Sequence, residues 1–276
     1  MKRKCLAIGI ILLFVGTCIV PAIAQNTEKQ SSRGNWLYVG GSGPGNYSKI
    51  QNAVNNASNG DTIFVYTGIY NEQITINKSI TLIGEDKNLT IINGSGIGDV
   101  VSFLADSVTF KCFTVQNSGG DVVNAGVSVK SNNDIIENNI FANNRNGIYI
   151  ENSANNTVSW NVITNNGNQS YEGSGISLCN STGNLIIENS IFANFGTGLI
   201  GTYTTQGDNI ISRNNITDNT EGVLFYEFSN NTITYNNITH CIQKGMVVIY
   251  SQNNSISINN FDFIVATENT AWSETK

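Results

Sequence analysis

Charged residues are scarce in this chain of 276 residues. Asp, Glu, Lys and Arg make up only 12% of it, the formal net charge is −6 and the pI is about 4.8. Binding of nucleic acid would require a basic patch, so we do not expect nucleic acid as a partner. The low charge does not indicate disorder, because β-branched residues recur at regular intervals among the 44 asparagines.

Residues that bind transition metals are also few. There is one histidine, and the five cysteines form no Cys-x-x-Cys pair, which argues against a zinc site. His240, Cys241 and Met246 lie close in sequence, but alternating side-chain directions would separate them, so we do not expect a copper site. We expect Cys112 and Cys179, like Cys241, to be buried packing groups without a disulfide. No metal site or other cofactor is predicted from these residues.

Only one long apolar run occurs, and it lies at the N-terminus. Residues 2–4 are basic, residues 6–20 are apolar, and Ala22–Ala24 provides a small-x-small ending. This pattern predicts a signal peptide over residues 1–24. The alternative is a retained membrane anchor, although the run is short for a span of ~20 residues. We therefore expect a secreted, periplasmic or extracellular surface protein that touches the membrane only through this segment, if it stays uncleaved.

From Asn132 to Asn260 one short sequence pattern recurs six times. A turn pair such as Asn-Asn, Gly-Asn or Asp-Asn is followed by an apolar residue, an asparagine and, two places later, a second apolar residue that we call the rung. Successive rungs are 22 to 28 residues apart, and they are Ile140, Ile163, Ile191, Ile216, Ile238 and Phe261, with Phe113 as a degenerate earlier copy. Each copy contains three short β-branched runs and a Gly-apolar pair such as Gly147-Ile148. Three such runs per copy predict one coil of a parallel β-helix.

Asparagine recurs at fixed places in each copy. The residues two places before the rungs are Asn138, Asn161, Asn189, Asn214, Asn236 and Asn259, and a second row follows the rungs with Asn143, Asn166, Asn194, Asn219 and Cys241. Side chains at the same place in stacked coils lie ~4.8 Å apart, so their amides can hydrogen-bond along the stack. We interpret these rows as structural ladders.

The N-terminal part has a different pattern. After a polar linker over residues 25–35, we assign residues 36–62 to a first strand and a capping helix, because residues 47–58 place apolar side chains on one helical face. Such a helix would cover the open first coil. Residues 63–276 would form the β-helix. No cap is evident after Phe261, so Trp272 or a partner chain could close that end.

One stretch resembles a known family. The run Ile50-Gln51-x-Ala53-Val54, Gly60-Asp61-Thr62-Ile63-x-Val65, Gly68-x-Tyr70-x-Glu72 and Ile74-x-Ile76-x-Lys78-x-Ile80-x-Leu82-x-Gly84 resembles the opening of right-handed parallel β-helix proteins of the NosD and pectinesterase-like kind. The repeats from Asn132 resemble NosD-type and carbohydrate-binding, sugar-hydrolase (pectin lyase-like) repeats. The resemblance implies an all-β fold, a single-stranded right-handed parallel β-helix of about nine coils with an N-terminal capping helix. It does not select an activity, since such repeats occur in lyases, hydrolases, epimerases and NosD itself.

Two long turns predict a notch on the solenoid. Residues 117–125 and 167–174 leave the same turn two coils apart, with a short turn between them. Asp121, Arg145 and Glu172 would border the notch as candidate catalytic residues, and Tyr171 as a candidate sugar platform. The alternative is that surface loops are polar and contain such residues without a function.

An outward row of residues precedes the asparagine ladder, and we list it as candidate ligand-binding positions: Glu137, Trp160, Glu188, Arg213 and Tyr235. Trp160 is the most informative member, because an exposed aromatic face suits a sugar ring. Glu188 and Arg213 lie on adjacent coils and could pair. Phe141 is also expected to point outward. Stacking between coils on a surface would explain the row equally without a ligand.

Three functions remain open. The leading expectation is a secreted or surface β-helix protein with a binding or structural role toward envelope or matrix polysaccharide. The second is a polysaccharide lyase or glycoside hydrolase acting at the notch. Lyases of this fold use clustered acidic residues to hold calcium, and no such cluster is present in the sequence, so we lean away from an enzyme. The third is a NosD-like accessory protein in copper-enzyme maturation.

Overall fold

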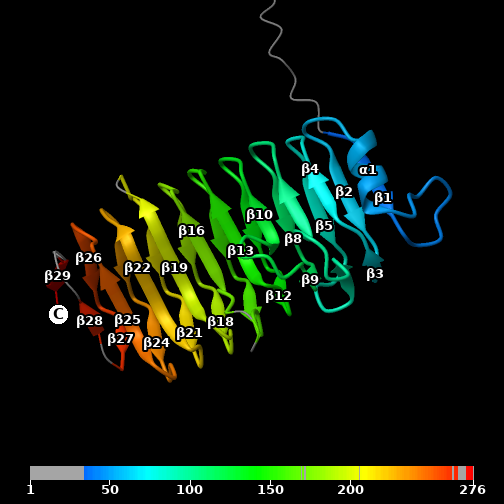
Figure 1. Ribbon diagram of the computed structural model, residues 1–276. Coiled ribbons are helices and arrows are strands. Elements are labelled where there is room, and N and C mark those ends of the chain that lie inside the picture. The colour runs from blue at the N-terminus through cyan, green and yellow to red at the C-terminus, as the bar shows by residue number, and fades with distance from the viewer. Residues whose placement is uncertain are drawn as a thin grey trace, which may run out of the picture. The chain divides into compact units, whose positions relative to one another are not determined.

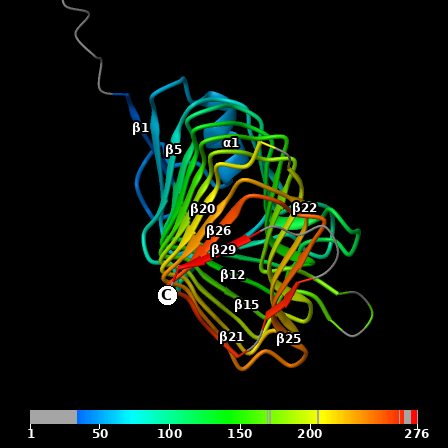
Figure 2. The same cartoon turned by 90° about the vertical axis from the view of Figure 1, so that its left-hand side faces the viewer.

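The strands of this protein wind into a solenoid. The computed structural model describes residues 34–168, 170, 172–204, 206–262, 264–266 and 272–275. Their strands form three parallel sheets of 11, 9 and 9 strands, and from β2 onward each sheet takes every third strand along the chain. Figure 1 shows the coils stacked from β1 to β29, and Figure 2 shows them superposed in a view from one end of the stack. The predicted all-β parallel β-helix of about nine coils is confirmed.

The three sheets are named A, B and C. Sheet A contains β1 (Trp36–Val39), β2 (Thr62–Val65), β5 (Thr81–Gly84), β8 (Thr109–Lys111), β11 (Ile135–Glu137), β14 (Thr157–Ser159), β17 (Leu185–Ile187), β20 (Ile210–Ser212), β23 (Thr232–Thr234), β26 (Asn254–Ser257) and β29 (Trp272–Thr275). Sheet B contains β3 (Gly68–Asn71), β6 (Thr90–Asn93), β9 (Thr114–Gln116), β12 (Ile140–Ala142), β15 (Val162–Thr164), β18 (Ser190–Phe192), β21 (Asn215–Thr217), β24 (Asn237–Thr239) and β27 (Asn260–Phe261). Sheet C contains β4 (Ile74–Ile76), β7 (Val101–Phe103), β10 (Ala125–Val129), β13 (Asn146–Glu151), β16 (Ile176–Cys179), β19 (Thr197–Thr204), β22 (Glu221–Phe228), β25 (Lys244–Ile249) and β28 (Ile264–Ala266).

Helix α1 (Ile50–Asn56) packs against β1, β2 and β4 at the first coil, as Figure 1 shows. It is shorter than the predicted 47–58, because Tyr47 forms a parallel bridge with Val39 and Ala57 is already extended. No helix among the described residues is long and apolar enough to cross a membrane. The predicted signal peptide over residues 1–24 lies outside the described residues, as do the side chain of Trp272 and all but residues 34–35 of the linker.

Two charged residues of the family-like motif hold the ends of α1. The Glu72 carboxylate accepts the backbone N–H groups of Ile50 and Gln51 at 2.9 and 3.1 Å. Lys78 Nζ donates to the carbonyl oxygens of three C-terminal residues, Val54, Asn55 and Ala57, at 3.1, 2.7 and 2.6 Å. An anion at the first turn and a cation at the last also match the helix dipole. The motif therefore encodes the attachment of the cap.

Apolar residues at equivalent places in successive coils fill the interior. In sheet B the inward row consists of Val115, Phe141, Ile163, Ile191, Ile216 and Ile238, all fully buried and paired in register. The predicted rung Ile140 therefore lies one residue before the inward position, and Phe113, although buried, lies two residues before its inward position Val115. Phe141 points inward rather than outward. The sequence pattern fits both Asn138 and Asn139, so it did not fix which of the two is the ladder residue. In the structure the ladder residue is Asn139, and this register places Phe141 on the buried face.

The first asparagine ladder runs along the turn between sheets A and B. Each backbone N–H donates to the Oδ1 atom of the next coil at 2.9 to 3.0 Å, through Asn139, Asn161, Asn189, Asn214, Asn236 and Asn259. Asn138 is not a member, which corrects the prediction. It adopts a left-handed backbone with φ 55° and is exposed, because the left-handed residue of this turn turns its side chain outward.

Two more ladders occupy the other turns. Between sheets B and C the members are Asn144, Asn166, Asn194 and Asn219, so Asn143 is again one residue early. Between sheets C and A they are Asp134, Asn156, Asn184, Asn209, Asn231 and Asn254, a row that we did not predict as a ladder. Three ladders thus satisfy backbone N–H groups at all three corners, where a sheet cannot.

Asp134 is the ladder member that carries a charge, and it is fully buried. Its carboxylate accepts Val108 N–H at 2.8 Å and the Ser131 hydroxyl at 2.6 Å. Burial nevertheless raises the pKa of Asp134 from 3.8 to about 6. Because the folded state then binds the proton more tightly than the unfolded chain, the stability from this group is full below about pH 4 and is lost as the pH rises through about 6.

Replacing Asp134 by asparagine is expected to stabilise the protein at pH 7.5 by roughly 1–3 kcal/mol, because a neutral amide fits the ladder without desolvating a charge. The gain should shrink toward pH 4. Thermal unfolding of both proteins at the two pH values measures it. The matched control is Asp121→Asn, an exposed position that should show neither the gain nor its pH dependence. An Asp134→Asn protein no more stable than wild type at pH 7.5 would contradict the argument.

Candidate functional site

A groove of about 380 Å³ lies on the outer face of sheet C. Its floor is one outward row of four neighbouring strands, β13, β16, β19 and β22, and consists of Tyr149, Ser177, Ile200 and Leu224. These residues face outward because strand side chains alternate and their neighbours, such as Ile148 and Leu199, fill the core. The floor offers apolar surface together with two hydroxyl groups.

One wall of the groove comes from the turns that precede sheet C. Arg145 and the exposed Glu172 line it, and Val122 reaches it from the earlier long turn. Asp121 is exposed but does not line the groove. Its backbone N–H donates to Asn124 Oδ1 at 3.1 Å, a hydrogen bond within its own turn. Tyr171 lies outside the described residues. The structure thus brings Arg145 and Glu172 to one groove and leaves Asp121 outside it.

Glu221 also lines the groove, and we missed it in the sequence. It begins β22, directly before Gly222, and the residues before the glycine in neighbouring copies, Asn146, Ser174 and Thr197, line the groove as well. Glu172 and Glu221 share a second, smaller cavity of about 100 Å³. Lys244 Nζ lies 3.9 Å from Glu221 Oε1. Two carboxylates are therefore balanced by the Arg145 guanidinium and by one lysine from the next coil.

The opposite wall consists of Cys179, Thr202 and Tyr203. The Tyr149 hydroxyl is held near Cys179, and burial together with this neighbour raises the pKa of Tyr149 above its ordinary value of 10.0. Like any protonated phenol, it can donate a hydrogen bond at neutral pH. Among the described residues no group of three or more His, Cys, Asp or Glu side chains could hold a metal ion. The groove can thus offer hydroxyl, carboxylate and guanidinium groups to a polar ligand.

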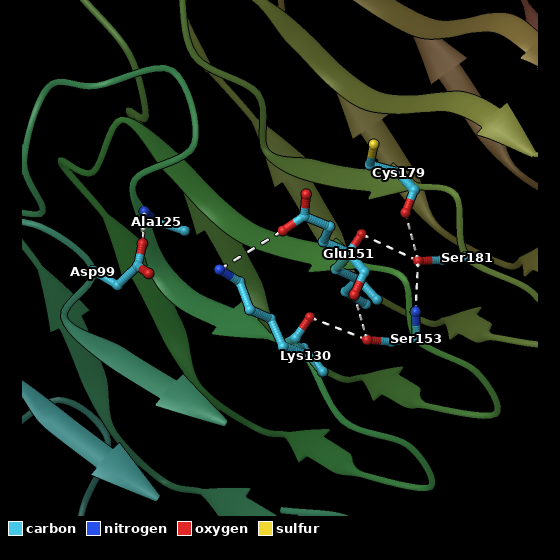
Figure 3. A network of polar contacts seen from close by, with 9 residues as sticks. Asp99, Ala125, Lys130, Glu151, Ser153, Cys179 and Ser181 are labelled. Atoms are coloured by element: carbon cyan, nitrogen blue, oxygen red, sulfur yellow. Dashed lines mark hydrogen bonds and ion pairs between the residues drawn. The ribbon is translucent and has the colours of Figure 1, made fainter. Parts of the chain in front are cut away.

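A polar network lies where strands β13 and β16 of sheet C end, next to this wall, and Figure 3 shows it. The Ser181 hydroxyl donates to the carbonyl oxygen of Cys179 at 2.8 Å and accepts the backbone N–H of Ser153 at 3.3 Å. On the outer face Lys130 lies 3.7 Å from the Glu151 carboxylate. The contacts of the Ser153 and Ser181 hydroxyls form a short ladder between coils, and the Ser181 hydroxyl holds the backbone carbonyl of Cys179, whose side chain lines the groove.

The predicted outward row lies at a different corner, between sheets A and B. Trp160, Glu188, Arg213 and Tyr235 occupy its left-handed positions, with φ between 55° and 59°. Trp160 is 61% exposed. Glu137 does not belong to this row, because it is the last residue of β11 and pairs with Lys111 at 3.1 Å. None of these residues lines the groove.

Glu188 and Arg213, which could pair from adjacent coils, are not among the ion pairs of the described residues. Arg213 instead lies over the Tyr235 ring, 5.5 Å from its centroid, which is a cation–π contact. This contact joins adjacent coils, as the stacking alternative suggested.

The cysteines are less buried than expected. Cys112, Cys179 and Cys241 are free and only partly buried. Cys112 adopts a left-handed backbone that turns it outward, and Cys179 faces the groove. Cys241 is closest to the prediction, since burial raises its pKa to about 11. His240 is exposed while Met246 is in the core, so these two do not share a surface with each other.

The fold and the groove define a class, a parallel β-helix with a polar groove on one outer sheet. Residues 95–262 match the family model described as right handed beta helix region, and the chain belongs to that family. A cell surface glycoprotein of Methanothermus fervidus is 31% identical over 230 residues, which cover 72% of this chain and 34% of that protein. The chain thus spans about a third of the length of this relative.

Solved structures of similar fold include carbohydrate-active proteins. A pectate lyase, Pel9A, is 18% identical with a TM-score of 0.63, over 88% of this chain and 77% of that chain. DFA-IIIase from Arthrobacter chlorophenolicus A6, in complex with DFA-III, is 16% identical with a TM-score of 0.65, over 82% and 67%. The A-module of the mannuronan C-5 epimerase AlgE6 from Azotobacter vinelandii is 16% identical with a TM-score of 0.59, over 78% and 73%. At these identities the likeness shows the fold alone.

Proposed function

We propose that this protein acts at the cell surface and binds a neutral polysaccharide in the groove on sheet C. The groove itself carries the proposal, because it combines an apolar floor with hydroxyl and charged groups along its walls. The location is supported by the name of the relative in Methanothermus fervidus, a cell surface glycoprotein, and by the predicted signal peptide.

The charges of the groove favour a neutral ligand. Its lining has two carboxylates, Glu172 and Glu221, and one cation, Arg145, and Lys244 supplies a second cation only through its contact with Glu221. The whole chain has a net charge of −6. A polyuronate would therefore meet no excess of positive charge, whereas a neutral sugar can accept from Arg145 and donate to both carboxylates.

A polysaccharide hydrolase or lyase is the second candidate. It is favoured by the position of Glu172 and Glu221, which line the same two cavities and could serve as acid and base. Asp121, one of the predicted catalytic residues, has no place in that arrangement. A role in copper-enzyme maturation rests on the family resemblance alone.

The test is binding of the purified protein to neutral gluco- and manno-oligosaccharides and to oligogalacturonate and oligomannuronate, by calorimetry, with product analysis of the same mixtures. The variant Ser177→Tyr fills the groove floor and should weaken binding of the neutral ligand at least tenfold, a loss of ~1.4 kcal/mol or more. Ser255→Tyr, at an outward position of sheet A, is the matched control and should bind as wild type does.

Each other outcome has a defined meaning. Absence of binding to every oligosaccharide would overturn the proposal, and so would preference for the acidic ligands. Release of new sugar ends that stops in Glu172→Gln or Glu221→Gln would make the protein an enzyme and promote the second candidate.

A further inference from the structure

Three tyrosines form a continuous strip beside the groove. Tyr203 and Tyr226 have ring centroids 5.9 Å apart, and Tyr226 and Tyr250 have theirs 5.7 Å apart, with interplanar angles of 77° and 83°. Tyr203 is 57% exposed and Tyr250 is 47% exposed. We call these three residues the tyrosine strip. It lies on β19, β22 and the residue after β25, along the solenoid axis.

The tyrosine strip connects two hollows of the surface. Tyr203 lines the groove already described. Tyr250 lines a second cavity, also of about 380 Å³, together with Glu227, Ser229 and Gln252. A ligand that leaves the groove along the axis therefore passes over aromatic rings and reaches another polar hollow.

The backbone at the strip is unfavourable for the residues it carries. Tyr203, Glu227 and Tyr250 have φ values of 55°, 51° and 49°. Asparagine, which tolerates this left-handed conformation best, fills the same place in the two preceding coils, as Asn152 and Asn180. The fold would accept asparagine in all five coils, so its replacement by large side chains calls for a reason beyond folding.

Packing between the rings is one such reason, because edge-to-face aromatic pairs are favourable in themselves. It does not explain why Tyr203 and Tyr250 are left so exposed, at 57% and 47% of their surface. Tyr226, which contacts both rings, is half-buried, and the neighbouring Glu227 carboxylate raises its pKa. Its protonated hydroxyl can donate a hydrogen bond. The strip thus offers exposed ring faces and polar groups together, as a sugar-binding surface does.

We infer that the tyrosine strip extends the groove into one long binding site for a polysaccharide chain that runs along the solenoid axis. This inference rests on the proposed function. Tyr203 and Tyr250 belong to coils two apart, so they are separated by ~10 Å along the axis. This distance is close to the length of two linked hexose rings, so alternate sugars of an extended chain can stack on the two exposed tyrosines. Glu227 again adds negative charge, which favours a neutral chain.

The length of the ligand provides the test. A disaccharide fits the groove without reaching Tyr250, whereas a hexasaccharide reaches both tyrosines. Calorimetry with cello- and manno-oligosaccharides of two and six residues is expected to show affinity for the hexasaccharide falling about tenfold in the double variant Tyr203→Asn/Tyr250→Asn. The affinity for the disaccharide should change less than about twofold in Tyr250→Asn. Tyr203→Phe and Tyr250→Phe should keep most of the affinity, since they keep the rings.

Matched controls separate binding from folding. Ile258→Asn makes the same kind of change, from an exposed apolar residue with φ 55° to asparagine, at the corner between sheets A and B. It should leave both affinities unchanged. The melting temperature of the tyrosine double variant should stay within a few degrees of wild type, because relief of the left-handed strain opposes the loss of ring contacts. If it falls further, Tyr250→Leu provides the second variant for the same comparison.

The outcomes distinguish the two proposals. If wild type binds the hexasaccharide, Ser177→Tyr abolishes that binding and the tyrosine variants leave it intact, the strip has no role and only this inference fails. If wild type binds no oligosaccharide of either length, the proposed function and the inference fail together. Equal loss of disaccharide and hexasaccharide affinity in Tyr250→Asn would also overturn the inference, since the effect of the substitution would then not depend on the length of the ligand.

Discussion

Replacing Asn189 by leucine is expected to destabilise the solenoid by about 3–5 kcal/mol, because it leaves several buried groups without partners. Asn189 is only 2% exposed. Its Oδ1 atom accepts the backbone N–H of Asn161 at 3.0 Å, and its Nδ2 donates to the Val158 carbonyl at 2.8 Å and to Asn214 Oδ1 at 3.0 Å. Leucine can replace none of these hydrogen bonds.

The loss should spread along the stack. Each coil of a solenoid is stabilised mainly by its neighbours, so a defect at Asn189 loosens the interfaces of its coil on both sides. Chemical denaturation gives the change in free energy, and hydrogen exchange should show faster exchange first at the amide of Asn161, whose acceptor is lost. An unchanged melting temperature would remove the explanation of the ladder as a structural device.

A neighbouring asparagine supplies the control. Asn215 follows the ladder residue Asn214 and is exposed, and its Oδ1 accepts the side-chain amide of Asn237 at 2.8 Å on the surface. Asn215→Leu makes the same chemical change where water can satisfy the polar groups. We expect a change of less than about 1 kcal/mol. The contrast between the two variants isolates burial as the cause.

The fold could be predicted because its signal is repeated. Every coil needs an inward apolar residue at the same place and an amide at the same turn, so one pattern recurs from Asn132 to Asn260. The register was less secure where the pattern is ambiguous. Asn138 and Asn139 are the same residue type, and only the backbone shows that the first of them is left-handed and faces out. The third ladder was noticed in the sequence only as turn pairs such as Gly183-Asn184 and Asp208-Asn209, and we did not interpret these pairs as a ladder.

The site could be predicted only in part, and the reason is geometric. The wall that contains Arg145 and Glu172 follows from turn length, which is visible in a repeat. The floor does not, because an outward residue of a parallel sheet such as Ser177 has no sequence feature that distinguishes it from any other surface residue. The tyrosine strip was not predicted, because Tyr226 and Tyr250 occupy different places in their own coils and therefore form no row in the repeat. They come together only on the folded surface.

The second large effect is expected for Gly175→Ala, in a column of glycines where sheet C begins. A Cβ atom at Gly175 would lie 2.5 Å from the carbonyl oxygen of Gly198 and 2.6 Å from Ile191 Cγ2, both in the next coil. Backbone oxygen cannot move aside as a side chain can, so the two coils must separate locally. We expect a loss of about 3 kcal/mol, measured by chemical denaturation.

Gly68→Ala is the matched control, since the nearest atoms to a Cβ atom there would belong to the Tyr70 side chain, at 3.4 to 3.5 Å, which is ordinary contact. It should change the stability by no more than about 0.5 kcal/mol. If Gly175→Ala were equally neutral, the close approach of the coils at this column would not be needed. Gly175 follows Ser174, which lines the groove, so a destabilised but folded Gly175→Ala protein should also bind the oligosaccharide more weakly. The glycine column therefore links the spacing of the coils to the shape of the groove.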